Sequence, residues 1–178
     1  MRTHAAFLCL AIAVAIPAAA QDYPKLKPGQ WEITTTTTRS GTPAPSKFTV
    51  CTDEAVQKQM MDMGKGMGRD MCSKFDFRRD GGKFVGDSVC QMGPTTMTSH
   101  SVMTLQGDTA YKTIVNATFD PPMAGMKDSA TTVEGKNVGP CRDSMKPGDV
   151  VSATGQKFNM TAVPDRPPIP APAPTKTK

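Results

Sequence analysis

Methionine is the residue type whose local density suggests chemistry. Five methionines crowd residues 60–71, and four of them have the spacing of a ligand set: Met60, Met63, Met67 and Met71. Soft thioethers select Cu(I), so we expect a Cu(I) site if the glycines at 64–68 let the chain fold back. The alternative is packing, because Val56, Met60 and Met63 follow the i, i+4, i+7 spacing of an apolar helix face. Both hypotheses stay open at this point.

The cysteines are a second candidate for chemistry. Cys9 lies in the apolar start of the chain, which leaves an even set of four: Cys51, Cys72, Cys90 and Cys141. In an exported protein an even number predicts two disulfides. A zinc site is disfavoured because the spacing has no C-x-x-C pair and no histidine nearby.

Three pairings of four cysteines are possible. We predict that Cys51 forms a disulfide with Cys72, because this bond would close the segment between two strands that contains the helix. Cys90 would then bond to Cys141. The competing pair is Cys72 with Cys90, which requires a three-residue turn at 80–82. A two-residue turn at Asp80 and Gly81 would instead place Phe77 opposite Phe84 and the two cysteines on opposite faces, and aromatic pairing favours that register.

Catalysis has weaker support in the sequence. His100 is the one histidine after residue 20, and its neighbours Ser99 and Ser101 would point to the opposite face of a strand. No paired carboxylates stand out, because many aspartates adjoin glycine or proline at turns. We therefore predict no catalytic residues.

The first twenty residues predict an export signal. A short basic start precedes an apolar run of about 12 residues, too short to span a membrane of roughly 20 helical residues. The small residues at 18–20 predict cleavage between Ala20 and Gln21. Cys9 lies inside the apolar run, so we expect no lipid anchor. No later run approaches a membrane span, so the mature chain is expected to be soluble in an oxidising compartment outside the cytoplasm.

Charge excludes one class of partner. The whole chain carries 21 Lys and Arg against 16 Asp and Glu, and loss of Arg2 with the signal leaves a net charge of +4. The basic residues are scattered and not interleaved with aromatics, so nucleic-acid binding is not expected.

The elements that would position these residues are mostly strands. Alternating or β-branched segments bounded by turn residues predict seven strands, near 31–38, 47–51, 75–77, 84–90, 95–105, 110–119 and 129–138. This order suggests a mainly β fold, an antiparallel meander that is closed or nearly closed into a barrel-like sheet, with one short helix. One domain is expected over residues 21–163.

The helix is expected between Cys51 and Cys72. Thr52 would cap it, acidic residues follow in the first turn, and Gly64 would end it. Residues 64–68 would then be a mobile loop. Residues 164–178 contain six prolines and predict a disordered, extended tail.

The pattern resembles the domain of unknown function 3617 (DUF3617) family of small exported proteins from Gram-negative bacteria. The residues that carry the resemblance are the opening 26–32, Cys51 before the helix, Cys72, the Gly81 turn, Cys90 and the late 139–141. The resemblance spans about residues 23–160 and implies a periplasmic, β-rich domain. It implies no activity and no site residues.

Together these observations favour a non-catalytic binding or envelope-associated module, for an apolar or amphipathic small molecule in a β cavity. The first alternative is a Cu(I)-binding protein that uses residues 60–71. A hydrolase is the third, and it would require His100 to meet a carboxylate in a cleft.

Overall fold

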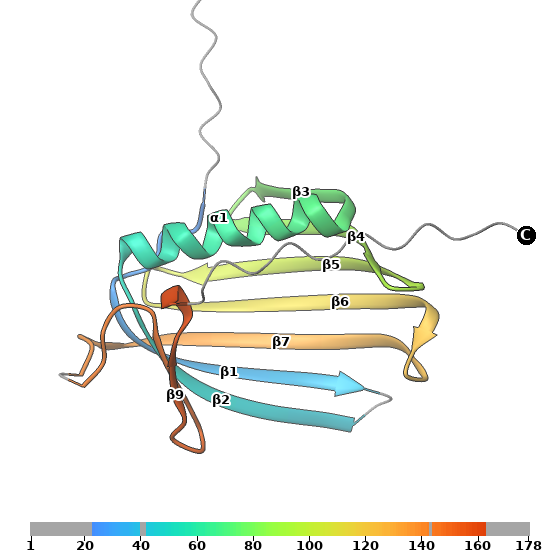
Figure 1. Ribbon diagram of the computed structural model, residues 1–178. Helices are drawn as coiled ribbons and strands as arrows, with labels where there is room; N and C mark the ends of the chain where they lie inside the picture. The colour runs from blue at the N-terminus through green and yellow to red at the C-terminus, as the bar shows by residue number, and fades with distance from the viewer. Residues whose placement is uncertain (1–22, 40–41, 143, 163–178) are drawn as a thin grey trace, which may run out of the picture.

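The computed structural model describes residues 23–39, 42–142 and 144–162. The predicted signal at 1–20 and the tail at 164–178 lie outside these ranges. One antiparallel sheet dominates the fold, with strand order β3-β4-β5-β6-β7-β1-β2-β8-β9 (Figure 1). The strands are β1 (Gly29–Arg39), β2 (Thr42–Thr52), β3 (Cys72–Asp80), β4 (Lys83–Met92), β5 (Thr95–Gln106), β6 (Ala110–Met123), β7 (Met126–Gly139), β8 (Asp149–Ser152) and β9 (Lys157–Asn159).

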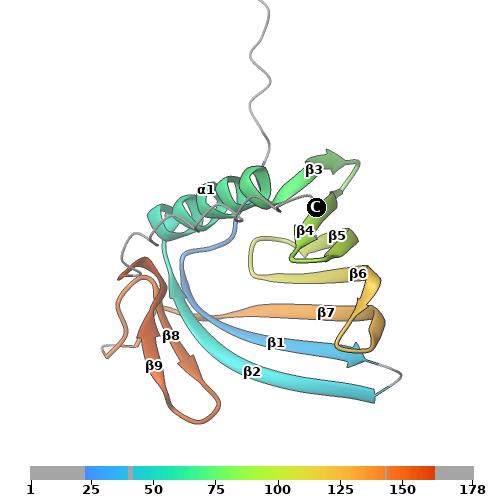
Figure 2. The same ribbon diagram turned by 45° about the vertical axis from the view of Figure 1, so that its right-hand side comes forward.

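The mainly β, antiparallel prediction is confirmed, and all seven predicted strands are present as β1 to β7. The prediction did not include β8 and β9, which extend the sheet beyond β2. The sheet bends but does not close, because β3 and β9 remain as its two edges. Figure 2 shows the bend, with the helix α1 (Glu54–Met71) lying across the concave side. Within the described ranges, no helix has the length and apolarity to cross a membrane.

Strand register defines which side chains share the concave face. One row crosses the sheet from β4 to β1 through the pairs Phe84 to Met103, Met103 to Thr113, Thr113 to Val133 and Val133 to Thr35. Phe84 is buried, whereas the rest of this row is only half-buried. We call this side of the sheet the inner face. Helix α1 lies on it, because Gly68 of α1 abuts the ring of Phe75, which shares the face of Phe84.

Helix α1 is longer than predicted and has a different cap. Asp53 is the N-cap and accepts a 2.8 Å hydrogen bond from the backbone of Val56, so the assignment of the cap to Thr52 is wrong. The helix runs through residues 64–68 to Met71, so the predicted loop there is also wrong. Packing outweighs the low helix propensity of glycine here, since Gly68 is buried against β3.

The predicted disulfide pairing is wrong: Cys72 bonds to Cys90, and Cys51 bonds to Cys141. The β3–β4 turn uses Gly81 and Gly82, so Asp80 pairs with Lys83, a register that differs from both of those considered. A bulge between Cys72 and Lys74 then brings Cys72 opposite Cys90. A bulge of this kind shifts the register by one residue, and counting from the turn does not reveal it.

The aromatic pair that favoured the wrong register nevertheless forms. Phe77 lies opposite Gly86 instead of Phe84, yet the rings of Phe77 and Phe84 stack with centroids 5.9 Å apart. Gly86 has no side chain, and this leaves room for the Phe77 ring to reach its diagonal neighbour. Aromatic contact is therefore compatible with more than one register.

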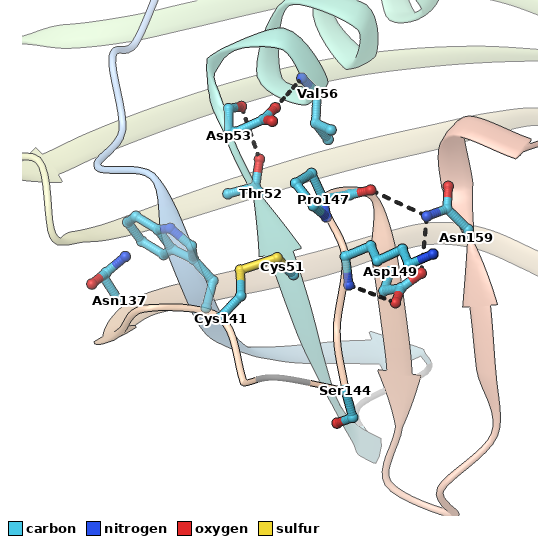
Figure 3. The surroundings of a disulfide bond; sticks show 12 residues. Cys51, Thr52, Asp53, Val56, Asn137, Cys141, Ser144, Pro147, Asp149 and Asn159 are labelled. Carbon is cyan, nitrogen blue, oxygen red and sulfur yellow. Dashed lines mark hydrogen bonds between the residues drawn. A yellow bond between two sulfur atoms is a disulfide. The ribbon is translucent and has the colours of Figure 1, made fainter.

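The most buried part of the core lies around the Cys51–Cys141 disulfide (Figure 3). Cys51 is fully buried and Trp31 is 2% exposed. The Trp31 indole donates a 2.9 Å hydrogen bond to the carbonyl of Lys27, and its ring lies 5.6 Å from that of Tyr111. Gly29 allows this approach of β1 to β7, because a Cβ there would collide with the carbonyl of Gly139. The disulfide joins the end of β2 to the chain after β7.

Candidate functional site

The predicted Cu(I) ligands all lie on one side of α1. With 100° per residue, Met63 and Met67 align with Val56, and Met60 and Met71 lie within about 60° of it. Val56 is buried, and its side chain points from α1 toward the sheet (Figure 3). The four methionines continue this line toward the helix C-terminus and are 37–50% exposed. We call Met60, Met63, Met67 and Met71 the methionine stripe.

The edge strand β3 supplies aromatic rings next to the stripe. Phe75 is 45% exposed and Phe77 is half-buried, and both lie on the inner face. Tyr23 extends the row, since its ring stacks on Phe77 with centroids 6.4 Å apart. The ammonium group of Lys65 lies over the Tyr23 ring, 4.2 Å from its centroid. The N-terminal segment is thereby held between α1 and β3.

A pocket of about 320 Å³ lies between α1, β3 and Tyr23. Its walls combine methionine and aromatic side chains with three charged groups, and the lining residues are Tyr23, Met60, Met61, Gly64, Lys65, Arg69, Phe75, Asp76 and Phe77. A second pocket of about 410 Å³ shares Tyr23 and Met61 with it and continues along residues 24–26 and the first turns of α1. Such volumes are in the range of small-molecule sites.

The rest of the inner face is lined by hydroxyl and aliphatic side chains. Thr37 and Thr131 are hydrogen bonded through their hydroxyls at 3.1 Å, as are Ser88 and Ser99 at 2.8 Å. Because these hydroxyls satisfy one another, they present little unpaired polarity to an apolar neighbour. Burial against this face raises the pKa of Tyr111.

The stripe does not gather its four thioethers at one point. The proposed gathering required the glycine segment to fold back, but α1 is continuous from Glu54 to Met71. At 1.5 Å per residue, Met60 and Met71 are about 16 Å apart along the axis. Neighbours at i, i+4, such as Met63 with Met67, are the pairs that can share an ion in this conformation. Cu(I) binding itself stays a prediction. Among the described residues, no three His, Cys, Asp or Glu side chains cluster as metal ligands do.

His100 does meet a carboxylate, but on the outer face. Its Nδ1 lies 2.7 Å from Oδ1 of Asp87, and Arg78 binds the other oxygen at 2.8 Å. The hydrogen bonds with His100 and Arg78 lower the pKa of Asp87 to about 2. A pocket of about 290 Å³ adjoins the pair. Ser99 and Ser101 point to the inner face as expected, with Ser101 donating to the carbonyl of Gly86. Hydrolysis stays an untested alternative.

Comparison with known proteins gives the family. Residues 26–141 match the family model described as "Protein of unknown function (DUF3617)", which covers well over half of the chain. The chain belongs to the DUF3617 family. No curated protein matches it. The match runs from Leu26 through β7 to Cys141, so it includes α1, the methionine stripe and all four disulfide cysteines.

Sequence reasoning missed two features of this DUF3617 protein. The contact of Tyr23 with Phe77 and Lys65 has no local signal, because it joins a non-strand segment to β3 and α1. The Asp87–His100 pair, in contrast, did have a local signal in the sequence. Gly93 and Pro94 form a two-residue turn, and counting back from Met92 and Thr95 places Asp87 opposite His100.

The disulfides also bear on location. Two disulfides join all four cysteines of the described residues. Disulfides of this kind form and persist in an oxidising, extracytoplasmic environment.

Proposed function

We propose that this DUF3617 protein is a non-catalytic periplasmic module that binds an amphipathic small molecule between α1 and the inner face of the sheet. The observation that carries the proposal is the exposure of apolar side chains on the inner side. The four stripe methionines and Phe75 make up five of the eight large hydrophobic residues that are exposed in the described part of the chain. Exposed apolar surface gathered in one place is typical of a binding site.

The side chains suit a ligand of variable shape. Methionine is unbranched and polarisable, so a row of thioethers can adapt to an acyl or ring system. Met60 is the stripe residue that lines the pocket beside β3, together with Met61, and Phe75 and Phe77 add rigid apolar walls there. Burying an alkyl chain there would be favourable by about 0.8 kcal/mol per CH₂.

The charged groups favour an anionic head group. Lys65 and Arg69, one helical turn apart, line the pocket together with a single acid, Asp76. Two cations against one carboxylate leave an excess positive charge at the apolar pocket. Long-chain carboxylic acids have this combination of a negative head and an apolar tail.

Titration with a fluorescent long-chain carboxylic acid tests the proposal. Wild-type protein should bind it saturably, and Met60→Gln should weaken binding about tenfold, which corresponds to ~1.4 kcal/mol of lost apolar contact. Ile114→Gln is the matched control, because Ile114 is 44% exposed on the outer face and should not contact the ligand. Equal weakening by both variants, or no saturable binding, would contradict the proposed site.

The head group can be tested separately. Arg69→Gln should weaken binding of the carboxylic acid but leave binding of its methyl ester unchanged, because only the acid is charged. A loss that is equal for acid and ester would assign Arg69 a structural role instead.

The periplasmic part of the proposal rests on the predicted signal together with the disulfides. Mass spectrometry of the exported protein should give a mature chain that begins at Gln21 and carries no free thiol. A chain that begins at Met1 would argue against export by this signal.

Cu(I) binding is the second candidate, favoured by the alignment of Met63, Met67 and Met71 at successive i, i+4 positions on an exposed helix side. Competition with a Cu(I) chelator, on wild type and on a variant with all four stripe methionines changed to leucine, tests it. Loss of copper uptake in the variant supports the candidate. Equal uptake by both proteins rejects it.

A further inference from the structure

The methionine stripe has an apolar segment of the same chain within reach. The described chain ends at Ala162, in the short helix η1 (Met160–Ala162). Figures 1 and 2 both place η1 beside the first turns of α1, where the line of Val56 and the stripe begins. We propose that residues 163–178 dock along the methionine stripe and occupy it until an amphipathic ligand displaces them. This inference rests on the proposed function only for the identity of the competing ligand.

The starting point of the segment is fixed by hydrogen bonds. Met160 donates to the carbonyl of Gly148 at 2.9 Å, and the backbone of Thr161 donates to the side chain of Asn159 at 2.9 Å. Asn159 is itself held by Asp149 at 2.9 Å (Figure 3). The two residues before Ala162 are therefore held by Gly148, which precedes β8, and by Asn159 at the end of β9.

The segment is long enough. The stripe extends about 16 Å from Met60 to Met71. Residues 163–174 in the polyproline II conformation, at 3.1 Å per residue, span about 37 Å. The segment can therefore follow the whole stripe with residues to spare for the approach.

The segment also has suitable chemistry. Residues 163–174 comprise six prolines, Val163, Ile169 and two alanines, with Asp165 and Arg166 as their only charged residues. A polyproline II chain makes no internal hydrogen bonds and is already extended, so it loses little conformational entropy on docking. Proline-rich segments dock in aromatic-lined grooves, and the unbranched, polarisable methionine side chain adapts to irregular apolar partners.

Covalent linkage favours this occupant over others. A segment tethered beside its site acts at millimolar effective concentration, so even weak contacts keep it bound. A second copy of the protein would have to reach comparable concentration to compete. An exogenous ligand must displace the tethered segment in order to bind. The segment would in turn compete with the bound ligand and so favour its release.

Methionine oxidation by dilute hydrogen peroxide tests docking without any ligand. The thioether takes one oxygen atom from the peroxide to give the sulfoxide and water, at a rate that follows exposure. We expect Met63 and Met67 to oxidise at least threefold faster in a chain that ends at Ala162 than in the full chain. Met126 in the β6–β7 region is the internal control and should oxidise equally in both.

Two further arms identify the occupant. A synthetic peptide of residues 163–178, added to the shortened chain, should restore protection, whereas a peptide of the same composition with glycine in place of proline should not. Protection of the full chain should not change with protein concentration. Equal oxidation of Met63 and Met67 in both chains, or protection that appears only at high concentration, would overturn the proposal.

Ligand binding separates this inference from the proposed function. The shortened chain should bind the fluorescent carboxylic acid at least threefold more tightly than the full chain. Equal affinity, with protection from oxidation also absent, would overturn docking but leave the ligand site intact. Protection without any binding of the acid would support docking and contradict the proposed ligand.

Discussion

Gly68 of α1 lies against the aromatic ring of Phe75 on β3, so closely that a Cβ at residue 68 would come within 2.6 Å of ring atoms. The two other glycines of the helix, Gly64 and Gly66, face open space, and a Cβ on either would meet no atom within 4 Å. The three glycines of one segment thus have different roles. Only Gly68 sets the distance between helix and sheet.

The first prediction contrasts these glycines. Gly64→Ala and Gly66→Ala should each raise the free energy of unfolding by about 0.5–1 kcal/mol, because alanine has the higher helix propensity. Gly68→Ala should lower it, because the Phe75 ring must move. Urea denaturation of the three variants measures this. Stabilisation by Gly68→Ala would show instead that the Phe75 ring can move away from the added methyl group without destabilising the protein.

The second prediction concerns the helix cap. Asp53→Ala should cost about 1 kcal/mol, because the carboxylate accepts the backbone hydrogen bond of Val56. The control is Thr52→Val, which keeps the shape of the side chain and removes the 3.3 Å hydrogen bond that the Thr52 hydroxyl donates to the carbonyl of Asp53. Thermal unfolding of the two variants measures the loss of stability. A larger loss for Thr52→Val than for Asp53→Ala would indicate that Thr52 is the N-cap.

The third prediction concerns the disulfides. The bridges span 90 and 18 residues of sequence. In the chain-entropy model, the longer loop contributes about 4.6 kcal/mol and the shorter about 3.2 kcal/mol, as upper values. Replacing Cys51 and Cys141 together by alanine should therefore destabilise more than replacing Cys72 and Cys90. Peptide mapping without reduction should link Cys72 to Cys90; a fragment that links Cys51 to Cys72 would refute the observed pairing.

The fourth prediction is a pH dependence. Bonds from Lys157, the backbone of Lys146 and Asn159 lower the pKa of Asp149 from 3.8 to about 2. The native state then holds this proton more weakly than the unfolded state. The stabilisation is complete above about pH 4 and is lost as the pH falls toward 2.

Asp149→Asn should lower stability at pH 6 and make it less dependent on pH between 4 and 2. The matched control is Asp128→Asn on β7, which is exposed and should keep the wild-type pH dependence. Urea midpoints at pH 6, 4, 3 and 2 give the measurement. If the urea midpoint of Asp149→Asn changes with pH as steeply as that of the wild type, other carboxylates control acid unfolding.

The positions of most strands could be predicted from the sequence, because the patterns that indicate a strand are local. Alternation and turn residues identified β1 to β7, but β8 and β9 have only four and three residues, too few for alternation to show. The helix was predicted in place but ended early, because propensity assigned Gly68 to a loop while its contact with Phe75 comes from a distant strand. Tertiary contacts overrode a local preference.

The candidate site was predictable only in part. The spacing of Val56, Met60 and Met63 indicated a helix face, but whether that face would be covered depends on the curvature of the sheet. The cysteine pairing failed for a similar reason. One bulged residue near Cys72 decides it, and bulges leave no clear trace in a single sequence.

The two disulfides are nested, with Cys72–Cys90 inside the loop closed by Cys51–Cys141. If the chain crosses a membrane from its N-terminus, the cysteines reach the oxidising side in the order 51, 72, 90, 141. An oxidase that joins cysteines as they arrive would first link Cys51 to Cys72, which is not a native pair. Biogenesis must therefore either leave Cys51 reduced until Cys141 has emerged or exchange that early bond afterwards. Maturation of this protein should accordingly depend on a disulfide isomerase more than on the oxidase alone.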